Sequence, residues 1–286
     1  MRGMDRVGCA VAMALGAALL WPCPLRAAVE LEDDSPEAQL MGFYAASLSF
    51  TPVGPSDPGA DFSAGVELAG IPSLSQEDRT TTFAGAKVEN TNFTPVLPRP
   101  RFRWRPGPGW LLEGTYVPAV HVFGIRPKMY GLAAARRLVA APHTLALWGR
   151  IHYFSAEIEG PITCSQDAVE DPTNTVCFGG QASSDRFRPN VRGVELLLEG
   201  GRLGSERLAG YLGLGYRRER LRFLTDFVNV FGRKDDQILE ATLDVVSYTA
   251  GLTWKAWRDL RVTGEGFYAP GVLATAKLGI AWEWGR

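Results

Sequence analysis

The chain has 286 residues, with 30 basic and 31 acidic side chains and a net charge of −1. This balance gives no argument for a nucleic-acid partner, which would call for an excess of basic residues, or for a cationic partner, which would call for an acidic tail. We therefore expect no nucleic-acid partner, and no motif in the chain indicates a cofactor or a metal site.

The first 27 residues have the pattern of a secretory signal peptide. Arg2 and Arg6 precede an uncharged apolar run over residues 7–20, and Pro22 interrupts it. The run is shorter than the about 20 residues of a membrane-spanning helix. We predict cleavage after Ala27; a lipoprotein signal is the alternative, but Pro22 stands where a small residue should precede Cys23.

The predicted mature chain divides into two parts. Residues 28–39 carry five acidic side chains, and we expect them to form a flexible periplasmic lead-in. Residues 40–286 alternate apolar with polar or small residues in segments bounded by Gly, Pro, Asn and Asp, which indicates an all-β chain. About twelve strands are expected, with ten or fourteen possible: residues 42–50, 62–69, 82–91, 97–104, 110–117, 128–138, 144–157, 191–200, 208–223, 239–254, 260–268 and 273–284.

The predicted strands suit a membrane barrel better than a soluble sandwich. Many are 10 to 13 residues long, which is the length of a tilted membrane strand. Tight connections such as 256–259 alternate with long polar ones at 159–189 and 224–237. In the last segment Leu278, Ile280, Trp282 and Trp284 share one face, and the terminal aromatic pair is typical of a membrane-interface girdle.

By these features the chain resembles the outer-membrane β-barrel proteins of Gram-negative bacteria, a porin-like class. The resemblance covers nearly the whole mature chain and implies a transmembrane antiparallel up-and-down barrel in the cell outer membrane. It also implies contact with outer-membrane lipid and lipopolysaccharide, and with the barrel-assembly machinery through the C-terminal strand. The chain departs from the class after Trp284, where Gly285 and Arg286 follow instead of a final aromatic residue.

Two cysteines, Cys164 and Cys177, remain after the predicted cleavage. An exported chain meets an oxidising compartment, so we predict a disulfide between them. The alternatives are two free thiols or a metal pair.

The strand register predicts a set of charged side chains that face the barrel lumen. Opposite charges in this set either pair across a filled interior or line a narrow aqueous path. The set comprises Glu113, Arg150, Glu195, Glu199, Arg217, Glu219, Asp244, Arg261, Glu265, Lys277 and Glu283. Arg99, Arg101 and Arg103 alternate with apolar residues. In the lumen they would form an anion-attracting ladder; facing outward near the periplasmic end, they would lie at lipid headgroups instead.

The sequence leaves two kinds of function open. A passive small-solute channel or a structural, surface-interaction protein is one expectation, and no catalytic residue is then required. The alternative is an outer-membrane hydrolase, acting on lipid or peptide, with its site at the external rim. His152 and Ser155 are the nearest match to a lipase pair, but a spacing of three would point them to opposite faces of a strand. Asp235 and Asp236 are the candidate acid pair in a long loop of the kind an omptin-like protease uses.

Overall fold

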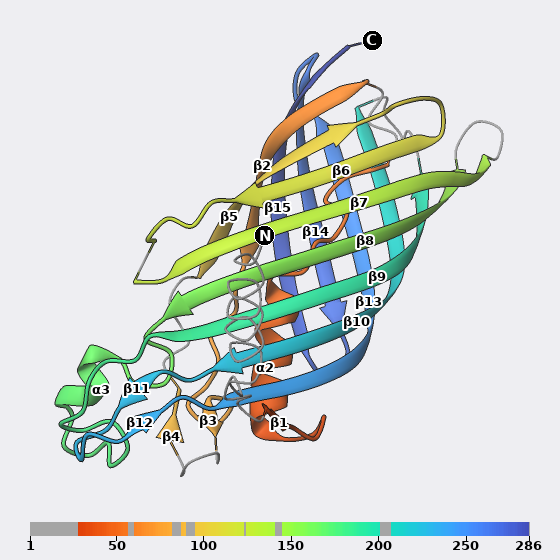
Figure 1. Cartoon of the computed structure of the whole chain (residues 1–286). Coiled ribbons are helices and arrows are strands. Elements are labelled where there is room, and N and C mark those ends of the chain that lie inside the picture. The colour runs from red at the N-terminus through yellow and green to blue at the C-terminus, as the bar shows by residue number, and fades with distance from the viewer. Residues whose placement is uncertain are drawn as a thin grey trace, which may run out of the picture.

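Ten long antiparallel strands form a closed barrel (Figure 1). The computed structural model describes residues 28–56, 60–81, 87–89, 95–122, 124–140, 145–200 and 207–285, so the expected signal peptide lies outside the described residues. The barrel strands are β2 (Phe62–Gly70), β5 (Val96–Trp104), β6 (Trp110–Val117), β7 (Arg126–Ala140), β8 (Leu145–Gly160), β9 (Asp185–Gly200), β10 (Leu208–Leu224), β13 (Ile238–Lys255), β14 (Leu260–Ala269) and β15 (Leu273–Trp284).

Each barrel strand pairs with its neighbours in the chain, and the first barrel strand closes on the last. Phe62 of β2 lies opposite Trp284 of β15. One end of the barrel carries the C-terminus and short connections, such as 105–109 and 256–259; we call it the short-turn end. The other, the long-loop end, carries 71–95, 118–125, 161–184 and 225–237, together with the tight turn at 270–272. In membrane barrels this asymmetry separates the periplasmic from the external side.

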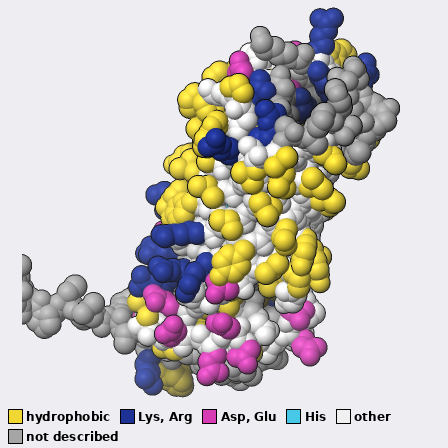
Figure 2. All heavy atoms as spheres, turned by 90° about the vertical axis from the view of Figure 1, so that its right-hand side faces the viewer, with side chains coloured by type: hydrophobic (Ala, Val, Ile, Leu, Met, Phe, Trp, Pro, Cys, Tyr) yellow, Lys and Arg dark blue, Asp and Glu magenta, His cyan; other side chains and the backbone are white. Residues whose placement is uncertain are grey.

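The outer wall carries an apolar belt between two rings of aromatic side chains. Exposed Phe and Trp gather towards the short-turn end, at Phe62, Phe102, Trp104, Trp110, Trp254, Trp257, Trp282 and Trp284. Tyrosines form the other ring, at Tyr116, Tyr130, Tyr153, Tyr216, Tyr248 and Tyr268. Leu132, Ile151 and Leu212 lie in the belt with about 60% of their surface exposed, and Figure 2 shows the belt as a broad yellow zone. A wall of this kind is suited to lipid rather than to water.

The expected strand at residues 42–50 is wrong, because this segment begins with the helix α2 (Pro36–Ser47). Ser35 caps the helix by accepting a hydrogen bond from the Ala38 amide at 3.2 Å, and Pro36 occupies the first helical position. The helix lies inside the barrel and is buried on nearly every side, so its sequence lacks the amphipathic period that usually reveals a helix. Among the described residues no helix is long and apolar enough to cross a bilayer.

The expected strand at residues 82–91 is not a barrel strand in the part that the structure describes. Residues 80–81 and 87–88 form β3 (Thr80–Thr81) and β4 (Lys87–Val88), a separate two-stranded sheet in the long loop between β2 and β5. Residues 82–86 and 90–91 lie outside the described residues. Without residues 42–50 and 82–91, the expected twelve strands become the observed ten.

Residues 28–39 differ from the expected flexible lead-in. β1 (Ala28–Glu30) pairs in parallel with Ile238–Glu240 at the start of β13, and the Leu31 amide extends the pairing to the Glu240 carbonyl at 2.8 Å. The expected boundary at 39/40 falls within α2. The backbone of β13 is free to pair here, because β14 pairs only with residues 248–255 of it. The described chain therefore begins at the long-loop end.

Candidate functional site: a lumen filled by the N-terminal segment

Residues 48–56, which we call the strap, run through the barrel between α2 and β2. The strap has no regular secondary structure, and each of its side chains is buried. Since a buried carbonyl needs a hydrogen-bond donor, the barrel wall has to supply one for each carbonyl that the strap does not pair itself. The wall does so mainly through arginine side chains.

Three arginines of β5 donate to successive carbonyls of the strap. Arg99 donates to the Leu48 and Ser49 carbonyls at 2.7 and 3.0 Å. Arg101 donates to those of Thr51 and Pro52 at 2.6 and 2.7 Å, and Arg103 donates to those of Val53 and Pro55 at 2.9 and 3.3 Å. The expected anion ladder is therefore lumenal, but its guanidinium groups are occupied by the strap and do not line an open path.

Strands on both sides of β5 also hold the strap. Lys277 of β15 donates to the Ser49 carbonyl at 2.7 Å, and Arg150 of β8 donates to that of Phe50 at 3.1 Å. Glu265 of β14 accepts from the Val53 amide at 2.9 Å. Glu199 of β9 accepts from the Ser56 amide at 2.5 Å. The strap is thus fixed to strands on all sides of the barrel.

Carboxylates of the wall neutralise the arginines that hold the strap. Glu67 of β2 pairs with Arg99 and, at 2.8 Å, with Arg101. Glu113 of β6 contacts Arg101 at 3.2 Å and Arg150 at 2.7 Å. All of these side chains are buried. A buried charge is tolerated only when it is paired and hydrogen-bonded, so the network and the strap depend on each other.

The structure places the predicted lumen charges inside the barrel, with one exception. Glu113, Arg150, Glu195, Glu199, Arg217, Glu219, Glu265, Lys277 and Glu283 are buried, and Arg261 is half-buried. Asp244 was assigned to this set wrongly. The inward side chains of β13 are the odd-numbered ones, so Asp244 points outward and accepts a hydrogen bond from the Tyr216 hydroxyl at 2.8 Å.

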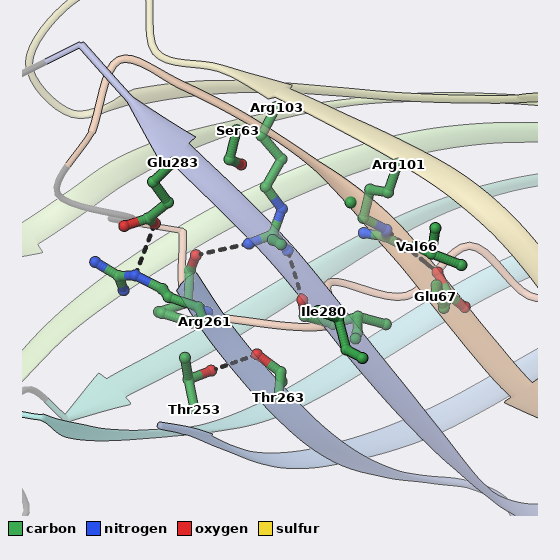
Figure 3. Close-up of a pocket in the computed structure, with 15 residues that line it drawn as sticks. Ser63, Val66, Glu67, Arg101, Arg103, Thr253, Arg261, Thr263, Ile280 and Glu283 are labelled. Atoms are coloured by element: carbon green, nitrogen blue, oxygen red, sulfur yellow. Dashed lines mark hydrogen bonds and ion pairs between the residues drawn. The ribbon is translucent and has the colours of Figure 1, made fainter. Parts of the chain in front are cut away.

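Little space remains beside the strap near the short-turn end. Figure 3 shows Arg101 and Arg103 there, with the pair Arg261–Glu283 at 2.7 Å and Thr253 bonded to Thr263 at 2.8 Å. The cavity between these groups has a volume of about 30 Å³. A cavity of this size holds about two water molecules, which is too small for a solute.

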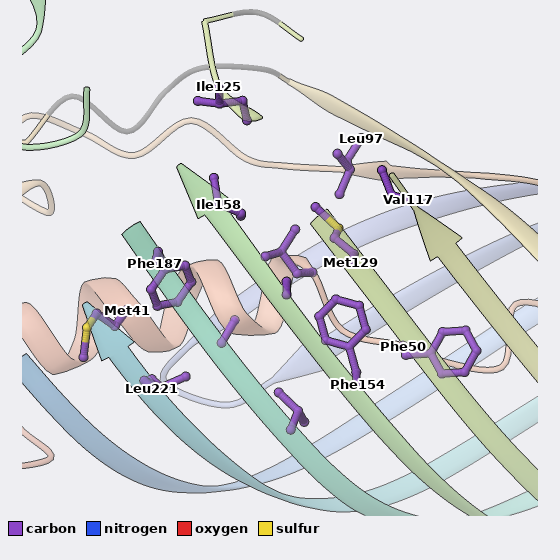
Figure 4. Close-up of a cluster of buried hydrophobic side chains, with 14 of the residues drawn as sticks. Met41, Phe50, Leu97, Val117, Ile125, Met129, Phe154, Ile158, Phe187 and Leu221 are labelled. Atoms are coloured by element: carbon purple, nitrogen blue, oxygen red, sulfur yellow. The ribbon is translucent and has the colours of Figure 1, made fainter. Parts of the chain in front are cut away.

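The half of the lumen towards the long-loop end is filled by apolar side chains instead of charges. Met129, Phe154, Phe187 and Leu221 come from four strands and pack with Met41 of α2 (Figure 4). The lumen is therefore polar around the strap and apolar around the helix. Among the described residues, both parts close it.

The loops at the long-loop end form an ordered cap. The predicted disulfide is confirmed: Cys164 and Cys177 are bonded, with 5.5 Å between their Cα atoms, and α3 (Gln166–Glu170) lies between them. Asp185, fully buried, accepts from the Thr163 amide at 2.5 Å and from the Asp226 amide at 2.9 Å. Asp185 thus ties this loop to the loop that carries β11 (Phe227–Val228) and β12 (Lys234–Asp235), which pair with each other.

The residues considered for hydrolysis do not converge. His152 is buried in the lumen beside Arg150, whereas Ser155 lies on the outer side of β8, as the spacing predicts. Asp235 belongs to β12 and accepts from the Thr225 hydroxyl at 3.1 Å. Of the other two histidines, His121 is exposed in a loop and His143 lies outside the described residues.

Sequence reasoning missed two wall residues that serve the strap. Glu67 lies on β2, where small residues obscure the alternation of apolar and polar side chains. Tyr211 donates to Glu265 at 2.5 Å and accepts from the Gly54 amide at 2.9 Å. Tyr211 lies on the face of β10 opposite Leu212, together with the polar and small residues, and this position in the alternation indicates that its side chain faces the lumen. The strap itself gives no such signal, because it has no periodic pattern.

No protein-family model matches the sequence, and no curated protein is significantly similar to it. Solved structures with a similar arrangement include the outer-membrane protease OmpT from Escherichia coli, at 10% identity and a TM-score of 0.41, over 78% of this chain and 93% of that one. Ail, the attachment invasion locus protein of Yersinia pestis, gives 10% identity and a TM-score of 0.30, over 78% and 97%. The monoaromatic hydrocarbon channel CymD gives 11% and 0.31, over 79% and 66%.

Proposed function

We propose that this protein is an outer-membrane barrel held closed by its own N-terminal segment, and that it acts through its external cap and not by passing solutes. The strap carries this proposal. Its backbone is bonded to strands from all sides of the barrel, and a channel would have to break these bonds to open. The apolar belt between two aromatic rings supports the membrane location.

The external cap supports a surface-interaction role. The disulfide and Asp185 hold two loops together. The cap presents an apolar tip, in which Phe231 is 84% exposed and Val230 is 56% exposed; Phe178, in the other loop of the cap, is 46% exposed. Exposed apolar side chains on an ordered surface outside the membrane are typical of contact sites. We therefore assign the contacts of this protein with other surfaces to this tip.

Single-channel conductance in a planar bilayer tests the closed lumen. We expect the refolded mature protein, residues 28–286, to insert without current steps, and a variant lacking residues 28–56 to give discrete steps. The second arm shows that silence is caused by residues 28–56 and not by failed insertion. Steady conductance of the complete chain would refute the proposal.

Retention of intact cells on an octyl-coated surface tests the apolar tip. Cells that display the double variant Val230→Ser, Phe231→Ser should be retained less than cells that display the wild type at equal surface density. Ser184→Ala, a change in the same cap away from the tip, is the control. Equal retention of all three would remove the tip from the proposal.

A further inference from the structure

A basic patch lies on the outer wall, just beyond the tyrosine ring at the long-loop end. It consists of Lys128, Arg188, Arg192, Arg218, Arg220 and Arg222. Figure 2 shows dark-blue side chains gathered directly below the yellow belt, with magenta acidic side chains farther towards the loops. From this arrangement, which rests on the proposed membrane location, we infer that the patch binds the phosphorylated headgroup of an anionic lipid in the outer leaflet, namely lipopolysaccharide.

The strand register places like charges directly beside one another. Arg218 of β10 lies opposite Arg192 of β9, and Arg222 lies opposite Arg188. Like charges in such positions repel and destabilise the sheet. Arg220 adds a third guanidinium to the same face of β10. An arrangement that is unfavourable for the protein alone becomes favourable when an anion lies over it.

Acidic neighbours neutralise only part of the patch. Glu157 pairs with Arg188 at 2.7 Å, and Glu240 pairs with Arg222 at 3.2 Å. Asp244 lies opposite Arg218 in the register, but its carboxylate accepts from the Tyr216 hydroxyl. Arg192, Arg218 and Arg220 form no ion pair with any residue that the structure describes. Three exposed guanidinium groups are therefore available to an anion.

The wall is also hollowed at the patch. A hollow with a volume of about 650 Å³ runs across β7, β8, β9, β10 and β13. It is lined by five of the basic side chains of the patch, namely Lys128, Arg188, Arg218, Arg220 and Arg222. Tyr130, Ser155 and Asn190 contribute neutral polar groups to the same hollow. Arginine is well suited to bind phosphate because its planar fork donates two parallel hydrogen bonds. The hollow thus offers charged and neutral donors together.

The position of the patch points to a lipid and not to a soluble anion. Towards the short-turn end, the same strands continue as the apolar belt, where Ile151, Val194 and Leu214 are at least half exposed. A ligand that covers both zones needs an anionic head and apolar chains. Basic side chains next to a membrane attract anionic lipid for this reason, and at the external side of an outer membrane that lipid is lipopolysaccharide.

Retention of lipid A by the refolded mature protein tests the inference. Wild type, the triple variant Arg192→Gln, Arg218→Gln, Arg220→Gln, and a control triple variant Arg136→Gln, Arg207→Gln, Arg258→Gln are mixed with bisphosphorylated lipid A in detergent. Bound lipid is counted by native mass spectrometry over a range of lipid concentrations. The control removes three exposed arginines at the short-turn end, so it changes net charge equally.

We expect the patch variant to bind lipid A about 100-fold more weakly, since each basic group near an anionic lipid contributes roughly fivefold. The control should bind like the wild type. Inorganic pyrophosphate should not displace lipid A at equal concentration, because it lacks the apolar chains.

Equal binding by the patch variant and the wild type would overturn the inference. Displacement by pyrophosphate at equal concentration would also overturn it, because the site would then belong to a free anion. Insertion of each protein into bilayers is measured in parallel. Failure of the wild type to insert would refute the membrane location itself, whereas an inserted protein with an indifferent patch would refute only the lipid site.

Discussion

Replacing Arg101 with Met should release the strap. The side chain donates to the Thr51 and Pro52 carbonyls and pairs with Glu67 and Glu113. Met keeps most of the volume but leaves the buried Thr51 carbonyl without this donor, at about 1–3 kcal/mol, whereas the Pro52 carbonyl keeps its hydrogen bond from Arg103. Removing one partner of a buried ion pair costs about 3–5 kcal/mol. Because these terms are coupled and not additive, we expect a loss of at least about 3 kcal/mol.

Two measurements read the effect of Arg101→Met. Urea unfolding in lipid vesicles should show the loss of stability, and planar-bilayer recording should show intermittent current steps that the wild type lacks. Arg105→Met is the matched control, because Arg105 continues the alternation of Arg99, Arg101 and Arg103. Its ion pair with Asp61 at 3.4 Å is partly exposed, and such pairs contribute about 0–1 kcal/mol. If Arg101→Met were as stable and as silent as Arg105→Met, the strap would not be held in the way described.

Three further predictions follow from the same structure. An epitope placed directly ahead of β1 should be stained on intact cells, because β1 pairs at the long-loop end. An epitope after the C-terminal strand should be stained only in permeabilised cells; the reverse staining would contradict this placement of the two ends. Cys164→Ser should leave the barrel folded but make the cap sensitive to added protease, since the closed loop of about 14 residues contributes about 3 kcal/mol; an equally resistant cap would count against this role. Gly251→Ala should destabilise the barrel by about 1–3 kcal/mol in urea unfolding, because the added methyl would lie 2.3 Å from the Tyr211 ring, while Gly264→Ala, which meets nothing within 4 Å, should behave like the wild type.

The barrel wall was predictable because its signal is periodic. Ten expected strands coincide with the ten barrel strands to within a few residues at most ends, and the largest difference is at β9, which begins at Asp185 and not at residue 191. Each strand has one face towards lipid and one towards the lumen, so apolar and polar residues alternate along it. Asp244 shows the limit of this reasoning, since a single error of register moves a side chain from the lumen to the outer wall.

The contents of the lumen were not predictable in the same way. α2 and the strap are surrounded by protein on all sides, and neither shows the one-sided pattern that indicates a helix or a strand. Their contacts are also distant in sequence: Lys277 reaches Ser49, 228 residues away. The alternating arginines of β5 are visible in the sequence, but nothing in their pattern indicates that backbone carbonyls are their partners.

The dimensions of the barrel explain why α2 and the strap belong to the fold. Eight strands enclose an interior that side chains just fill, so ten strands leave additional space, and α2 and the strap occupy it. The wall is shaped for them. A methyl group added at Gly131 of β7 would lie 3.2 Å from the Phe50 ring, and one added at Gly279 of β15 would lie 2.7 Å from Val53. Glycine at these positions allows the strap to approach the sheet closely, which an open channel would not require. Together with the arginine donors, this fit indicates that the closed lumen is the state that the sequence encodes.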